Sequence, residues 1–89
     1  MNTTTLAITY THHDGNWFHV STINRNSSSP LAPDMVYAET IVWECDENTG
    51  TRGNMVWQGS CAHGSLVTHN ATVDRIRATG SPEQPEHDS

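Results

Sequence analysis

The fold is decided by residues 36–78, which begin Val36-Tyr37-Ala38-Glu39-Thr40-Ile41-Val42-Trp43-Glu44-Cys45. Apolar residues occupy both alternating sets of this run, which is typical of a central strand. A polar turn follows, then a second apolar run over 54–59, then a helical period that extends to Arg77. The stretch therefore predicts a strand, a turn, a second strand and a helix.

The helical period is carried by one stripe of residues spaced three and four apart: Ala62, Leu66, His69, Val73 and Ile76. We place the helix start between Ser60, a possible N-cap, and Ser65, and the stop at Gly80. Leu66, Val73 and Ile76 are expected to be buried against the sheet. We expect His69 to be a core histidine with its nitrogens hydrogen-bonded, facing Glu39 and Thr40.

The first hairpin joins the alternating runs 5–12 and 17–23 around Asp14-Gly15. A three-residue loop pairs Tyr10 with Phe18 and keeps the apolar residues on one face, so we choose it. A two-residue loop pairs Tyr10 with His19 instead. In the second hairpin we expect Trp43 to face Trp57, a favourable cross-strand aromatic pair.

Serine, asparagine and proline dominate residues 24–34, which indicates an irregular, mobile connector between the two hairpins. Residues 79–89 read as a disordered acidic tail. The expected architecture is one α+β domain over residues 1–78. It consists of a four-stranded antiparallel sheet, made of two hairpins, with one C-terminal helix packed on one face.

Charge limits the possible partners. Ten acidic residues, four arginines and no lysine give a net charge of −6, so the chain lacks the basic footprint of a nucleic-acid binder or of a protein that binds anionic membrane. The acidic residues Glu44, Asp46 and Glu47, with those of the tail (Glu83, Glu86 and Asp88), leave open an acidic nucleic-acid mimic that inhibits a host protein. No secretory signal or membrane span is recognisable, so we expect a cytoplasmic protein.

Six histidines and two cysteines raise the question of a metal site, but no Cys-x-x-Cys or His-x-x-x-His pair occurs. We therefore expect no metal, no cofactor and no catalytic residue. The alternative is a zinc- or thiol-dependent site at the strand–helix junction, built from Cys45, Cys61 and His63. In its thiol form, Cys61 near the helix start would be the nucleophile, with Glu39 or Asp46 orienting His63.

The segment Glu39-Thr40-Ile41-Val42-Trp43 and the helix residues His69, Val73, Ile76 and Arg77 resemble small uncharacterised proteins of phages and actinobacteria. The shared pattern is a Glu-Thr-aliphatic-aromatic strand followed by a histidine-containing C-terminal helix, and it covers about half the chain. The resemblance implies a phage or mobile-element origin and carries no activity with it.

One helix can cover only one face of a sheet, yet the central strand is apolar on both. We place an interaction surface at Val36, Ala38, Val42 and Val56, opposite the set containing Trp43. A two-fold homodimer is the simplest use of such a face, and cover by Leu31 and Pro33 of the connector is the alternative. The sequence thus predicts a small non-enzymatic accessory protein that binds a protein partner or itself.

Overall fold

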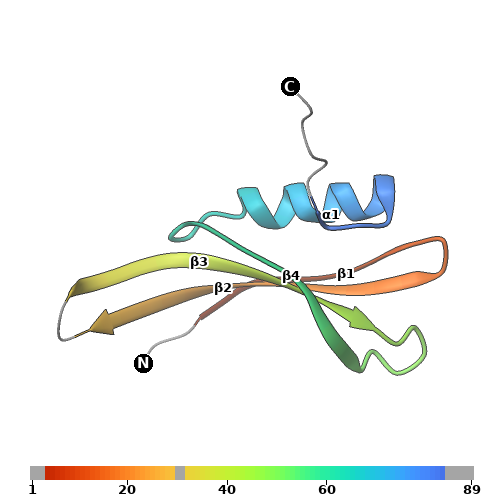
Figure 1. The fold of residues 1–89 in the computed structure, drawn as a ribbon, viewed down its shortest axis with the longest axis horizontal. Coiled ribbons are helices and arrows are strands. Elements are labelled where there is room, and N and C mark those ends of the chain that lie inside the picture. Colours follow the sequence, from red (N-terminus) through yellow and green to blue (C-terminus); the bar gives the residue numbers. More distant parts are fainter. Residues whose placement is uncertain (1–3, 30–31, 84–89) are drawn as a thin grey trace.

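The computed structural model describes residues 4–29 and 32–83, with the backbone alone described between 26 and 35 (Figure 1). The elements follow one another as β1 (Thr4–His13), β2 (Asn16–Ser29), β3 (Ala32–Cys45), β4 (Arg52–Ala62) and α1 (Val67–Thr79). The four strands form an antiparallel meander in the order β1-β2-β3-β4, and α1 lies on one side of it. The α+β fold expected from the sequence is therefore confirmed.

The expectation of an irregular connector over 24–34 is wrong for the residues that are described. The β2–β3 ladder continues through this region, from Asn24↔Ala38 to Ser29↔Ala32. Pro33, which interrupts the sequence pattern, falls in β3 near the closed end of this long hairpin, where a missing N–H removes few ladder bonds. The polar residues 24–29 therefore belong to strand β2. The ladder is made by backbone N–H and C=O groups, which polar residues also carry.

The β1–β2 hairpin has the two-residue loop, so the preferred three-residue register is wrong. His13 pairs with Asn16 and Tyr10 pairs with His19. Asp14 and Gly15 have φ values of 51° and 80°, the two left-handed positions of a type I′ turn. This turn matches the right-handed twist of the strands, and that preference outweighs the gain from placing all apolar residues on one face.

The β3–β4 hairpin is also displaced from its expected register. Trp43 pairs with Met55, whereas Trp57 pairs with Val42, because irregularities interrupt the ladder on both sides of Trp43. A short turn precedes β4, in which Asp46 Oδ1 accepts hydrogen bonds from the backbone N–H groups of Asn48 (2.8 Å) and Thr49 (2.9 Å). A bulge shifts every following side chain to the other face, so the expected tryptophan pair does not form.

Helix α1 begins later than its sequence stripe suggests. Ser60 and Ala62 belong to β4, and the first helical residue is Val67, so Ser60 is not the cap. The end is as expected, because Gly80 adopts a left-handed conformation (φ 80°) and its N–H donates to the Ile76 carbonyl at 2.8 Å. Just beyond it, Pro82 is buried and its carbonyl accepts from Arg75 Nε at 2.9 Å. The proposed tail is thus docked at its start, and residues 84–89 lie outside the described part.

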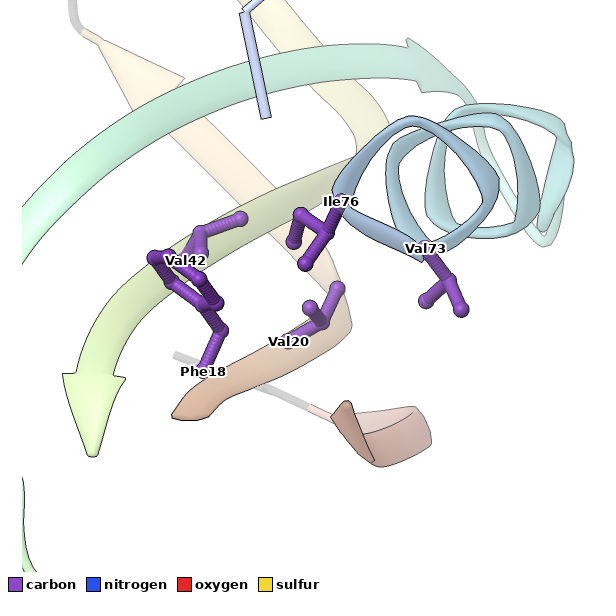
Figure 2. Close-up of a cluster of buried hydrophobic side chains, with 5 residues drawn as sticks. All are labelled: Phe18, Val20, Val42, Val73 and Ile76. Atoms are coloured by element: carbon purple, nitrogen blue, oxygen red, sulfur yellow. The ribbon is translucent and has the colours of Figure 1, made fainter. Parts of the chain in front are cut away.

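The core lies between α1 and the sheet and is small. Figure 2 shows its buried apolar side chains, which come from β2, β3 and α1: Phe18, Val20, Val42, Val73 and Ile76. Val73 and Ile76 are buried as the helical stripe predicts, while Leu66, which precedes the helix, is half-buried. The partly buried Trp57 packs against this cluster, so β4 also contributes to the helix-covered face.

A polar chain runs through the same layer. His69 is 2% exposed; its Nε2 lies 2.8 Å from the Thr9 hydroxyl and its Nδ1 lies 2.9 Å from the Thr22 hydroxyl, which in turn lies 2.6 Å from Thr40 Oγ1. These bonds connect α1 to three strands. The expectation of a core histidine with both nitrogens hydrogen-bonded is confirmed, but Glu39 is not one of its neighbours, since it points to the other face.

Candidate binding site on the open sheet face

Among residues 4–29 and 32–83, no element covers the sheet face opposite α1 (Figure 1). Alternation along each strand assigns side chains to the two faces. Val20 and Val42 are fully buried beneath α1, so their neighbours His19 and Trp43 point the other way. We call this uncovered surface the open face.

Three aromatic side chains from neighbouring strands form a row across the open face. The register pairs Tyr10 with His19 and His19 with Trp43. Ring centroids are 4.9 Å apart between Tyr10 and His19 and 5.4 Å apart between His19 and Trp43, both in edge-to-face geometry. Such contacts stabilise a sheet beyond simple burial. The row therefore forms a rigid floor rather than a set of separate side chains.

Arg52, the first residue of β4, extends this row. Its guanidinium carbon lies 4.5 Å from the centroid of the Trp43 ring, a cation–π contact. A groove with a cavity volume of about 560 Å³ lies above the row, within the size range of ligand sites. We call it the open-face groove, and its lining residues are Thr5, Ile8, Tyr10, His19, Ser21, Ile23, Ile41, Trp43, Gly50, Thr51 and Arg52.

His19 is the unusual residue of the groove. Its side chain is enclosed by its aromatic neighbours, and the residue is only 7% exposed. Its Nδ1 is buried and has no hydrogen-bond partner among the described residues. Burial, and next the positive charge of Arg52, lower the pKa of His19 below the ordinary value of about 6.5. His19 is therefore neutral near pH 7, which leaves Arg52 as the charged group of the groove.

Beside the groove, the open face holds a satisfied ion pair. Glu39 is 5% exposed and accepts hydrogen bonds from Arg25 Nη1 at 2.9 Å and from the Gln58 side-chain amide. Both oxygens of the carboxylate are thus occupied by groups of the same chain. The pair fixes three strands at this end of the face and has no free carboxylate to offer a ligand.

The residues of the interface expected from the sequence do not form one exposed surface. Ala38 and Val42 are fully buried on the side of α1, so they cannot meet a partner in the folded chain. Val36 and Val56 are exposed, at 55% and 38%. The error has one cause: α1 covers the face of Val42 rather than the face of Trp43, and the residues left uncovered are those of the opposite set. The alternative cover, Leu31 and Pro33, lies outside the described side chains.

The alternative zinc or thiol site is not assembled. Cys61 pairs with Ala38, while Cys45 is seven residues further along β3, a separation of about 23 Å along the strand. The Cys61 thiol donates to the Ser65 carbonyl at 3.5 Å, and His63 is exposed in the following turn. Within residues 4–29 and 32–83, no cluster of three potential metal ligands exists.

The thiol mechanism loses its other supports as well. Cys61 lies in β4 rather than at the start of α1, where the thiol mechanism places it. Glu39 is engaged by Arg25, and the hydrogen bonds from Thr49 and Asn48 lower the pKa of Asp46 at the far end of β3. Asp46 therefore has a structural role in its turn. Glu44 and Glu47, the other two acidic residues of this cluster, are exposed.

Comparisons of the chain with protein-family models, with curated proteins and with solved structures give no match. Among the described residues, no helix is long and apolar enough to cross a membrane. The candidate site therefore rests on its own geometry. Sequence reasoning missed the members of this site because the strand register brings Tyr10, His19, Trp43 and Arg52 together from four strands. A signal in the sequence was the two-residue loop at Asp14-Gly15, which pairs Tyr10 with His19.

Proposed function

We propose that this chain is a small non-enzymatic accessory protein that binds protein through its open face. One observation carries the proposal: Ile8 and Tyr10 are 52% and 50% exposed on a face that also holds Ile23, Ile41 and Trp43 and that no element of the described chain covers. Contiguous apolar surface of this kind on a small domain usually marks an interaction site. A phage or mobile-element origin and a cytoplasmic location belong to the same proposal, and two free cysteines fit a reducing compartment.

Self-association is the simplest form of this function. Four strands about 4.8 Å apart, each contributing about seven residues of about 3.3 Å, cover roughly 450 Å². A standard interface buries about 800 Å² on each partner. A two-fold dimer that uses the open face alone is therefore expected to be weak and to form at tens of micromolar or above. A partner that also reaches Arg52 can bind more tightly.

Amide chemical shifts of the labelled protein, recorded over a series of concentrations, test the proposal residue by residue. We expect concentration-dependent shifts at Tyr10, His19 and Trp43 and constant shifts at exposed Val67 of α1. The same spectra can be recorded with extended peptides in which isoleucines flank an aspartate, an asparagine or a lysine. Constant shifts over the whole face, in the concentration series and with every peptide, would contradict a binding role for the open face.

A further inference from the structure

Arg52 differs from the other three arginines in how its charge is used. Arg25 donates to Glu39, Arg75 donates to Pro82 and Thr72, and Arg77 donates to Thr11. Within the described part of the chain, Arg52 has no hydrogen bond through its side chain and no carboxylate oxygen within 4.0 Å. Its guanidinium rests on the Trp43 ring, which leaves its five N–H donors available.

The groove beside Arg52 offers apolar walls and one further unused polar atom. Ile8, Ile41 and His19 line it, and the Nδ1 of His19 is buried without a partner among the described residues. A group that reaches Arg52 through the groove comes next to the imidazole, whose rotation about χ2 would bring the buried nitrogen toward it. The preferred occupant therefore combines apolar side chains with an acceptor of negative charge.

A second copy of the chain supplies only the first of these. The one carboxylate that strand alternation places on the described open face is Glu39, and its oxygens already accept from Arg25 and Gln58. Two open faces packed together would desolvate Arg52 without giving it an acceptor, so self-association is expected to be weak and a partner that brings a carboxylate to bind more tightly. The chain as a whole carries a net charge of −6, yet this face presents an unpaired cation.

We infer that the open-face groove takes an acidic segment of a partner protein, in which an aspartate or glutamate flanked by apolar side chains places its carboxylate on Arg52. This inference rests on the proposed function and specifies the partner's chemistry. A guanidinium fork matches a carboxylate in two parallel hydrogen bonds. Stacking on Trp43 holds the fork in place before binding, so little side-chain entropy is lost when the carboxylate arrives.

The test uses a designed peptide, blocked at both ends, in which isoleucine, aspartate and isoleucine alternate with threonine. Alternate residues of an extended chain share one face, so both isoleucines and the carboxylate can meet the groove together. Companion peptides carry asparagine or lysine in place of aspartate. Binding is followed by the amide shifts of His19 and the indole N–H shift of Trp43, with an oligothymidylate as a separate probe for a phosphate-bearing partner.

We expect the aspartate peptide to bind about tenfold more tightly than the asparagine peptide. Arg52→Gln should abolish this difference, whereas Arg77→Gln, which removes the same charge away from the groove, should preserve it. Arg52→Lys should retain only part of it, because a lysine lacks the fork.

Other outcomes overturn the inference. Equal binding of the aspartate and asparagine peptides, unaffected by Arg52→Gln, would leave a purely apolar binding face, so the proposed function would stand without this inference. Tighter binding of the oligothymidylate would assign Arg52 to phosphate instead. Binding of no probe would also overturn the inference, and the concentration series then decides the proposed function separately.

Discussion

His69 Nδ1 and the Thr22 hydroxyl lie 2.9 Å apart in the layer between α1 and the sheet. The other ring nitrogen, Nε2, is hydrogen-bonded to the hydroxyl of Thr9 in β1. The hydroxyl groups can rotate to donate or accept, so both tautomers of a neutral imidazole are satisfied. A core with few large apolar side chains is in this way held together partly by a directed polar chain.

Replacing His69 by leucine should destabilise the fold although it adds apolar volume. The change removes both hydrogen bonds and leaves the hydroxyl of Thr22, which is fully buried, dependent on Thr40 alone. An unsatisfied buried polar group costs about 1–3 kcal/mol. Urea unfolding should show this loss, and the exposed His63→Leu should change the free energy of unfolding by less than about 0.5 kcal/mol.

The pH dependence of stability should follow the two buried histidines. Burial lowers the pKa of His69, and burial with the Arg52 charge lowers that of His19, so the unfolded chain binds these protons more tightly than the folded chain. Stability is then complete above the unfolded value of about 6.5 and declines as the pH falls below it.

Urea midpoints measured between about pH 7.5 and pH 5 check this expectation. His69→Gln should flatten the profile, because glutamine does not titrate. A midpoint that rises as the pH falls through this range would show that the folded state prefers the protonated imidazoles.

Ile76 is the apolar residue of α1 on which the sheet packing most depends, since it is fully buried in the core cluster. Ile76→Ala should cost about 2–5 kcal/mol and Ile76→Val about 0.5–1.5 kcal/mol. The matched control on the same helix is Val67→Ala, because Val67 is 73% exposed. Equal melting temperatures for Ile76→Ala and Val67→Ala would mean that α1 does not pack as described.

Gly59 makes room for Trp57 on the helix-covered face. A Cβ at this position would collide with the Trp57 indole, whose outer ring atoms lie directly over the glycine. Gly59→Ala should therefore displace the tryptophan from the core edge and cost about 1–3 kcal/mol. In Gly53→Ala, on the same strand, the new methyl group makes only ordinary contacts with Glu44 at 3.6 Å or more. Tryptophan emission and melting temperature should change in the first variant and stay near the parent values in the second.

Long-range consequences of register account for most of what the sequence could not predict. The spacing of His69, Val73 and Ile76 identifies the buried stripe of α1, and Gly80 marks its end, because both signals are local. The face of β3 that the helix covers is not a local property, since both alternating sets of this strand contain apolar residues. The interface prediction consequently included Ala38 and Val42, which are core residues.

The members of the open-face groove carry no motif of their own. Tyr10 and His19 become neighbours through the type I′ turn at Asp14-Gly15, whereas the apolar pattern of the two strands favours the other register. Arg52 meets Trp43 because the β3–β4 ladder is irregular, and a bulge leaves little trace in a single sequence. From sequence alone, a charged side chain next to a turn, such as Arg52, is expected to be solvated, because its contact with Trp43 depends on the register.

Light scattering of the parent chain, Ile8→Asp and Val67→Asp from tens of micromolar to about 1 mM tests the central claim most directly. Each variant adds one negative charge at an exposed apolar residue, but only Ile8 lies on the open face. We predict that the average mass of the parent rises with concentration toward that of a dimer, that Ile8→Asp stays monomeric, and that Val67→Asp behaves as the parent. Association that survives Ile8→Asp and disappears in Val67→Asp would place the interaction surface on the helix and contradict the account.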